Sequence, residues 1–175
     1  LDQIKAMGIK ELELAGLPPD LTADVLTAEL KKRDLKAVSS HFPYKRYKTD
    51  LDNVVKEAQG LGVQFAGCAW IDHQGDFDEA ECRDAVAVFS KASEALAKVG
   101  IKFFYHAHGY EFQPHGDGTL FDLFMKETEA AKVNVELDVL WIIYPGQDPV
   151  KLMEKYGSRW VLMHLKDLKK GIETG

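Results

Sequence analysis

A short phrase that recurs four times constrains this 175-residue chain more than any other feature. The copies are Met7-Gly8-Ile9-Lys10, Leu61-Gly62-Val63-Gln64, Val99-Gly100-Ile101-Lys102 and, more loosely, Tyr156-Gly157-Ser158-Arg159. Each copy follows an amphipathic stretch and precedes a strand-like run, which is β-branched or aromatic after the last three copies. Glycine just after the last helical turn adopts the left-handed conformation that ends a helix. Four returns from helix to strand predict βα units wound on a parallel sheet.

The same pattern places the elements along the chain. The predicted strands span residues 10–15, 35–41, 63–70, 102–108, 133–140 and 160–166. The predicted helices span residues 22–32, 50–59, 79–98, 120–131 and 150–155, and a further helical pattern opens the chain. No linker or low-complexity segment divides them, which predicts one partial domain over residues 1–175. Both ends read as cut from a longer sequence.

Local signals support two of the helix starts. Thr49 with Asp52 reads as a capping box for the helix over residues 50–59. Asp148 before Pro149 places a capping carboxylate ahead of a proline at the first helical position.

Strand parity selects the type of parallel sheet, because successive side chains point to opposite faces. Over residues 133–139, valine and leucine occupy one face, and Asn134, Glu136 and Asp138 occupy the other. His164 and Lys166 also share a face of their strand. An open sheet covered on both sides would carry aliphatic residues on both faces. The alternation therefore favours an α/β barrel of the TIM type with six of eight strands present, helices outside and functional groups inside.

Charge and composition narrow the partners. The formal net charge of -6 and the scattered basic residues disfavour a nucleic-acid partner. No apolar stretch approaches the ~18 residues that a membrane span needs, and no signal peptide is visible. Cys68 and Cys82 lack CxxC spacing and read as two reduced thiols. We therefore expect a cytoplasmic protein with no membrane partner, with export left open because the N-terminus reads as missing.

Polar side chains close most of the predicted strands. They are Glu13, His41, His106 with His108, Asp138, and His164 with Lys166. Because a parallel barrel gathers the carboxyl ends of its strands around one mouth, we expect these side chains in one site. Asp138 lies on a strand otherwise rich in valine and leucine, where a buried carboxylate has to be paired, hydrogen-bonded or bound to a metal.

Each of these residues has a structural alternative. His106 and His108 lie two residues apart on one predicted strand face, so their imidazoles can reach a common centre. Glu13 and His41 fit a site or a solvated strand end, and Glu111 fits a site or a solvated loop.

The same holds for two residues that follow the strands. Trp141 reads as a core or rim aromatic, or as an apolar platform for a sugar ring. Lys166 either pairs with Asp167 or meets an oxyanion.

The residue types point to one kind of chemistry. The sequence lacks a glycine-rich phosphate loop, a Gly-x-Ser-x-Gly elbow and an HExxH motif. A mixed Asp, His and Glu set suits a divalent cation such as Mn²⁺, Co²⁺, Mg²⁺ or Zn²⁺. Such an ion polarises a carbonyl and stabilises an enediolate while a neighbouring carboxylate or imidazole moves a proton.

On these motifs the chain resembles the sugar phosphate isomerase/epimerase family, the xylose-isomerase-like (β/α)8 barrels. The likeness is greatest to the branch whose fifth strand reads YHNHxxEF, which here is the stretch from Tyr105 to Phe112. It continues through the Glu136–Trp141 and Pro145–Val150 stretches and ends at His164-Leu165-Lys166-Asp167. Glu13 and His41 also sit where the family places residues after its second and third strands.

The resemblance implies a divalent metal and proton transfer at carbons beside a carbonyl. Asp138 and His164 match metal ligands of the sixth and seventh strands. His106 stands where many members have a glutamate ligand, and the usual glutamate of the eighth strand has no counterpart. We predict metal ligation by Asp138, His164 and His106, and catalytic roles for His106, Lys166 and Glu13. The predicted substrate-binding residues are His41, His108, Glu111 and Trp141.

The leading hypothesis is a metal-dependent isomerase, epimerase or dehydratase acting on a keto-sugar, cyclitol or related small carbohydrate, with a homo-oligomer left open. A non-catalytic carbohydrate-binding or degenerate barrel is the alternative. Endonuclease-IV-like DNA repair is disfavoured, because Trp141 stands where that class needs a histidine and the chain is acidic.

Overall fold

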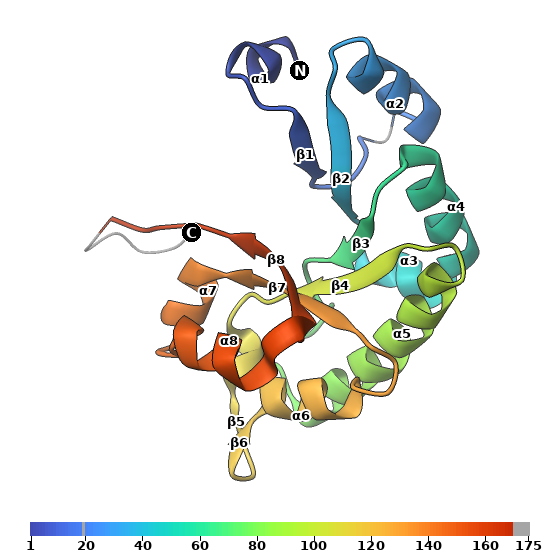
Figure 1. Cartoon of the computed structure of the whole chain (residues 1–175). Helices are drawn as coiled ribbons and strands as arrows, with labels where there is room; N and C mark the ends of the chain where they lie inside the picture. The colour runs from blue at the N-terminus through green and yellow to red at the C-terminus, as the bar shows by residue number, and fades with distance from the viewer. Residues whose placement is uncertain (19, 170–175) are drawn as a thin grey trace.

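The computed structural model describes residues 1–18 and 20–169. Its main sheet has six parallel strands, in the order β1 (Glu11–Leu14), β2 (Lys36–His41), β3 (Phe65–Cys68), β4 (Lys102–His106), β7 (Asn134–Asp138) and β8 (Trp160–His164). The sheet curls into a half-barrel (Figure 1). Each predicted strand is present, and the parallel order is the one that βα units give.

Helices return the chain between successive strands and pack outside the curl (Figure 1). They are α2 (Ala23–Lys31), α4 (Leu51–Leu61), α5 (Glu79–Ala97), α6 (Leu120–Glu127) and α8 (Pro149–Tyr156). Shorter elements are α1 (Asp2–Ala6), α3 (Tyr44–Thr49), α7 (Val139–Ile143), the 3-10 turns η1 (Tyr110–Phe112) and η2 (Gly157–Arg159), and a hairpin of β5 (Pro114–His115) and β6 (Gly118–Thr119). All five predicted helices are therefore confirmed, within a few residues at their ends. No helix in the described ranges is long and apolar enough to cross a membrane.

The glycine phrases end helices as predicted. Gly62 caps α4 in the left-handed conformation, with φ of 68°. Gly8, Gly100 and Gly157 also have positive φ angles, of 80°, 78° and 50°. A residue with a β-carbon is strained in this region, which explains why glycine recurs at the joints.

One capping prediction is confirmed and one is wrong. Asp148 Oδ1 accepts hydrogen bonds from the backbone N–H groups of Val150 and Lys151, with Pro149 at the start of α8. Thr49 does not cap α4. It is the last residue of α3, and its hydroxyl donates to the carbonyl of Lys45, because the chain is already helical there.

Five of the six strands end one or two residues earlier than predicted, and the ends of β4 and β7 shape the mouth of the half-barrel. Asp138 Oδ1 accepts hydrogen bonds from the backbone N–H groups of Leu140 and Trp141, at 3.0 and 3.2 Å, and so turns the chain into α7. β4 ends at His106, so His108 lies in the following loop. The expectation that His106 and His108 share a strand face is therefore wrong.

The two faces of the sheet follow the predicted alternation on β7 but not fully on β8. Val135 and Leu137 are buried on the outer face of β7, and Glu136 and Asp138 are buried on the inner face. On the outer face of β8, in contrast, Met163 is 44% exposed, and Leu165 beyond the strand is 85% exposed. β8 is an edge of the sheet, and the described helices cover it less completely than the central strands. Cys68 and Cys82 are free and buried, in line with the prediction.

Gly67 on β3 is expected to be intolerant of any side chain. A β-carbon there would lie 2.4 Å from Cζ of Phe104, whose ring is fully buried on β4. We expect Gly67→Ala to lower the free energy of unfolding by about 1–3 kcal/mol, because the buried ring has to move. Urea unfolding measures the change. Gly60→Ala, on α4, is the control and is expected to be neutral or stabilising, because its β-carbon meets nothing closer than 3.5 Å. Equal stabilities of the two variants would contradict the prediction.

Candidate metal and substrate site

A cavity of about 450 Å³ lies at the carboxyl ends of the strands. Its wall brings together eight of the predicted site residues, namely Glu13, His41, His106, His108, Asp138, Trp141, His164 and Lys166. A larger cavity, of about 820 Å³, opens near the beginnings of β4 and β7 and contains none of the eight. In parallel barrels the chemistry is placed at the carboxyl ends of the strands, so the smaller cavity is the candidate site.

Asp138 is the centre of the arrangement. Its side chain is fully buried, and one oxygen, Oδ1, is used by the start of α7. The other oxygen, Oδ2, has no hydrogen-bond partner among residues 1–18 and 20–169. It lies 3.8 Å from His106 Nε2 and 3.6 Å from His164 Nδ1. A buried carboxylate oxygen therefore faces two imidazole nitrogens.

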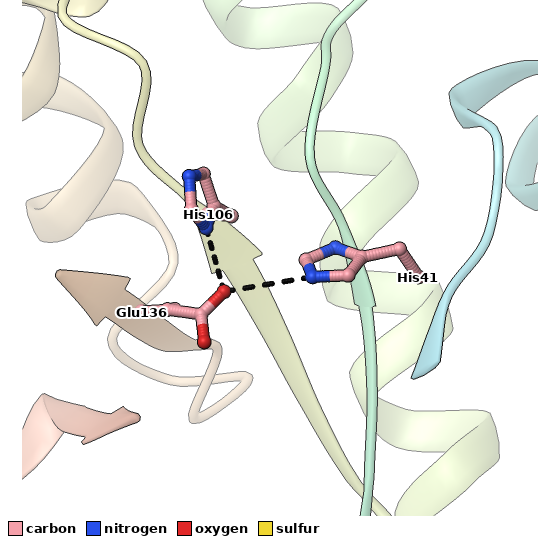
Figure 2. Close-up of side chains that lie close together, drawn as sticks. All are labelled: His41, His106 and Glu136. Carbon is pink, nitrogen blue, oxygen red and sulfur yellow. Dashed lines mark hydrogen bonds and ion pairs between the residues drawn. The ribbon is translucent and has the colours of Figure 1, made fainter. Parts of the chain in front are cut away.

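Each of these two imidazoles is held from its other side by a carboxylate. His106 Nδ1 lies 2.6 Å from Glu136 Oε2, and His164 Nε2 lies 2.7 Å from Glu13 Oε1. Figure 2 shows Glu136 on β7 between His106 on β4 and His41 on β2. Because each carboxylate fixes the orientation of its histidine ring, one nitrogen of each ring faces Asp138 Oδ2.

Glu13 also ties β1 to β2. Its Oε1 accepts a hydrogen bond from His41 Nε2 at 2.9 Å, and its Oε2 accepts one from the hydroxyl of Ser39. Burial opposes ionisation of Glu13, but the hydrogen bonds from His41 and Ser39 outweigh it and lower its pKa to about 2. Glu13 is therefore ionised at neutral pH.

The pKa of Glu136 is shifted in the opposite direction to that of Glu13. Burial and the nearby negative charge of Glu13 raise the pKa of Glu136 to about 7. The two carboxylates thus differ in protonation, with Glu13 charged and Glu136 the group that retains a proton. The sequence analysis did not identify Glu136 as a site residue. Its position on the same strand face as Asp138 was the signal that could have found it.

Two imidazoles of the site, those of His106 and His108, have pKa values well below the ordinary value for histidine. Burial lowers the pKa of His106 to about 3, assisted by repulsion from His164 and His41. Burial likewise lowers the pKa of His108 to about 4, with a further contribution from His106. Nδ1 of His108 lies 3.3 Å from the carbonyl oxygen of His106, so Nδ1 carries the proton and Nε2 keeps its lone pair.

The rim of the cavity combines an aromatic face with a cation. The ammonium group of Lys166 lies 4.5 Å from the centre of the Trp141 ring, in a cation–π contact. The ring of His108 lies 5.6 Å from Trp141 on the inner side. Neither of the two predicted alternatives for Lys166 accounts for this contact, and no ion pair joins it to Asp167 in the described structure.

Glu111 is the one predicted site residue that is absent from the cavity wall. It is only 2% exposed, and its carboxylate accepts hydrogen bonds from the backbone N–H groups of His108 and Gly109. It lies behind the loop that carries His108.

The donor set fits a divalent cation. With Nε2 of His164 donating to Glu13, its Nδ1 presents a lone pair to Asp138 Oδ2, and His106 Nε2 lies on the same side. Acceptors that face one another in a buried place repel unless a cation or a donor lies between them. Ligand atoms of His106, Asp138 and His164 lie within 4.8 Å of one another. A histidine that binds a metal usually bonds a carboxylate through its other nitrogen, as both rings do here.

Comparison with curated proteins gives relatives named inosose dehydratase. No protein-family model matches the chain. An inosose dehydratase from Clostridium botulinum is 29% identical over 190 residues, which cover 97% of this chain and 62% of that protein. The chain thus spans less than two thirds of the length of the first curated relatives it matches.

Solved structures agree with the fold. The crystal structure of a sugar phosphate isomerase/epimerase from Parabacteroides distasonis has a TM-score of 0.82 and 25% identity, with 99% of this chain and 71% of that chain covered. An IolI protein with a bound zinc atom has a TM-score of 0.71 and 16% identity, with 99% and 69% covered. The predicted fold, a TIM barrel of the xylose-isomerase type, is confirmed. The names of these relatives also agree with the predicted enzyme class.

Proposed function

We propose that this chain belongs to a divalent-metal-dependent enzyme that moves a proton beside the carbonyl group of a keto-sugar or keto-cyclitol. Among such reactions we favour dehydration of an inosose-like cyclitol, because a relative with that named activity matches nearly the whole chain. The stretch from Tyr105 to Phe112 supports assignment to the branch with YHNHxxEF on its fifth strand. The observation that carries the proposal is the unpartnered, buried Oδ2 of Asp138 opposite two imidazole nitrogens.

Three residues would hold the metal, namely Asp138, His106 and His164. Zinc, manganese, cobalt or magnesium are the candidate ions, and the two imidazoles favour the first three over magnesium. When bound, the ion would polarise the substrate carbonyl and stabilise the enediolate. Glu136 and Glu13 would orient His106 and His164. This geometry supports a positioning role for Glu13 rather than the catalytic role predicted from the sequence.

The remaining polar groups of the cavity would act on the substrate. Nε2 of His108 carries a lone pair and His108 lines the cavity, so this nitrogen would accept a proton from the carbon beside the carbonyl. Lys166 would place a positive charge near the developing oxyanion or donate to the leaving hydroxyl. The face of Trp141 would pack against the apolar side of the ring.

The test uses the purified 175-residue chain, stripped with chelator and reloaded separately with each of the four ions. An inosose is incubated in D₂O, and mass spectrometry and NMR follow deuterium uptake beside the carbonyl and the loss of water. We expect metal-dependent deuterium uptake together with loss of water. Uptake without water loss would replace dehydration by isomerisation or epimerisation. Failure to retain any ion, or retention without deuterium uptake, would overturn the proposed activity.

A further inference from the structure

We propose that Glu111 is a positioning residue whose buried carboxylate fixes the two loops that follow β3 and β4 and so sets the wall of the cavity. The consequence for turnover rests on the proposed function, whereas the structural role does not. The sequence analysis predicted Glu111 as a substrate-binding residue. The structure instead places the carboxylate behind the wall, where it contacts backbone rather than cavity.

The carboxylate of Glu111 first fixes the loop that follows β4. Oε1 of Glu111 accepts a hydrogen bond from the N–H of His108 at 2.9 Å, and Oε2 accepts one from the N–H of Gly109 at 2.6 Å. The hydroxyl of Tyr105 also donates to Oε1. Three donors thus converge on one carboxylate that is 2% exposed. Burial raises the pKa of Glu111, and the hydrogen bonds from Tyr105, His108 and Gly109 oppose that shift. These hydrogen bonds leave the two backbone amides little freedom.

Hydrogen bonds also connect Glu111 to the loop that follows β3. The hydroxyl of Tyr105 lies 2.8 Å from the hydroxyl of Tyr110, which in turn accepts a hydrogen bond from the N–H of Ile71 at 2.9 Å. Ile71 follows Trp70, whose ring contacts that of Tyr110 at a centroid distance of 4.8 Å. A continuous set of hydrogen bonds therefore joins Glu111 to the loop that holds Trp70.

Both loops lead to the cavity. The ring of Trp70 lies 5.8 Å from that of His108, and it lines a smaller cavity of about 230 Å³ that also includes His41. Gly109 approaches α7 so closely that a β-carbon would lie 2.8 Å from the carbonyl oxygen of Trp141. Loss of the hydrogen bonds to Glu111 would therefore let His108 move and let Gly109 shift against Trp141. His108 and Trp141 both line the site. Glu111 acts through these residues and does not touch the substrate.

Both oxygens of the carboxylate are required as hydrogen-bond acceptors. Glutamine has the same shape but replaces one acceptor oxygen by an NH₂ group, which would face a backbone N–H or the Tyr105 hydroxyl. One buried donor would then lack an acceptor. Glu111→Gln is expected to loosen the loop locally without removing a metal ligand.

The experiment measures amide hydrogen exchange by NMR in the 175-residue chain. In Glu111→Gln we expect exchange at His108 and Gly109 to accelerate by about tenfold or more. Tyr110→Phe removes the acceptor of the Ile71 N–H and the partner of the Tyr105 hydroxyl but leaves the Glu111 carboxylate in place. In this variant acceleration is expected at Ile71 while His108 and Gly109 stay protected. Tyr156→Phe is the matched control, because the Tyr156 hydroxyl also contacts a carboxylate, that of Asp122 on α6, away from the cavity. It should leave all three amides unchanged.

Two outcomes would overturn the proposal. One is unchanged exchange at His108 and Gly109 in Glu111→Gln. The other is equal acceleration at these amides and at core amides such as Val135, which would indicate a general loss of stability. In the activity arm we expect kcat/KM to fall by about tenfold or more with unchanged affinity for Mn²⁺. If the wild-type chain shows no turnover, the proposed function fails, and the exchange data still decide the role of Glu111.

Discussion

Asp138→Asn is expected to weaken divalent-metal binding by at least about 100-fold and to abolish turnover while the fold is retained. Asparagine is as good an N-cap as aspartate, so its side-chain oxygen can still accept the hydrogen bonds from Leu140 and Trp141 that begin α7. What the substitution removes is the negative charge on the second oxygen, which faces His106 and His164. The two functions of one carboxylate are thereby separated.

Titration calorimetry with Mn²⁺ and Zn²⁺ measures the affinity, and thermal unfolding in chelator measures the fold. Asp138→Ala should lose the cap as well, at a cost of about 1 kcal/mol in stability. Asp148→Asn is the matched control, because Asp148 caps α8 through the same pair of backbone contacts and does not line the cavity. Metal affinity of Asp138→Asn equal to that of Asp148→Asn would exclude Asp138 as a ligand.

Glu136→Gln is expected to stabilise the metal-free chain at pH 8 and to weaken its metal binding. The pKa of Glu136 is raised from 4.5 to about 7, so the folded state holds a proton that the unfolded chain has released. Between these two values the folded state binds more protons, and the wild type loses stability as pH rises. The loss is complete above pH 7 and amounts to about 3 kcal/mol at most, at ~1.4 kcal/mol per pH unit. Glutamine does not titrate and escapes this loss.

Urea unfolding in chelator at pH 8 and at pH 5 tests the prediction. The advantage of Glu136→Gln should be large at pH 8 and nearly absent at pH 5, where the wild-type carboxyl is protonated. A difference that is the same at both values would contradict it. In the metal arm, affinity should fall by about 10- to 100-fold, because the group that orients His106 no longer carries a charge. The ionised Glu136 carboxylate is therefore expected to lower the stability of the metal-free fold and to strengthen metal binding.

The sequence was informative where chemistry and backbone conformation coincide. Glycines at the helix-to-strand joints predicted the parallel sheet, because few other residues adopt positive φ without strain. Strand parity then placed Asp138 and His164 on the inner face and near the mouth, where the structure brings them together. These signals are local, because they depend on neighbouring residues and not on how distant segments pack.

The errors arose where one side chain had two competing partners. Residues 139 and 140 are apolar and read as the end of the strand, but the Asp138 side chain accepts hydrogen bonds from the N–H groups of Leu140 and Trp141, and α7 begins there. Thr49 reads as a cap, but α3 incorporates it. The surroundings of Glu136 and Glu111 were not predicted, because burial and the direction that a loop takes after its strand are not local properties of the sequence. Such features depend on packing between segments that are distant in the sequence.

The hydrogen bond between Glu13 and His164 has a mechanical consequence. It joins the first and last strands of the sheet order across the hollow side of the curl, over a separation of 151 residues. A ligand that binds His164 would therefore keep β1 and β8 close together and oppose flattening of the sheet. Separation of β1 from β8 would in turn weaken binding of that ligand. A ligand that binds only the curled sheet would stabilise the curl by about 2.7 kcal/mol at 100 times its Kd. Occupancy of the mouth and curvature of the half-barrel would then rise and fall together.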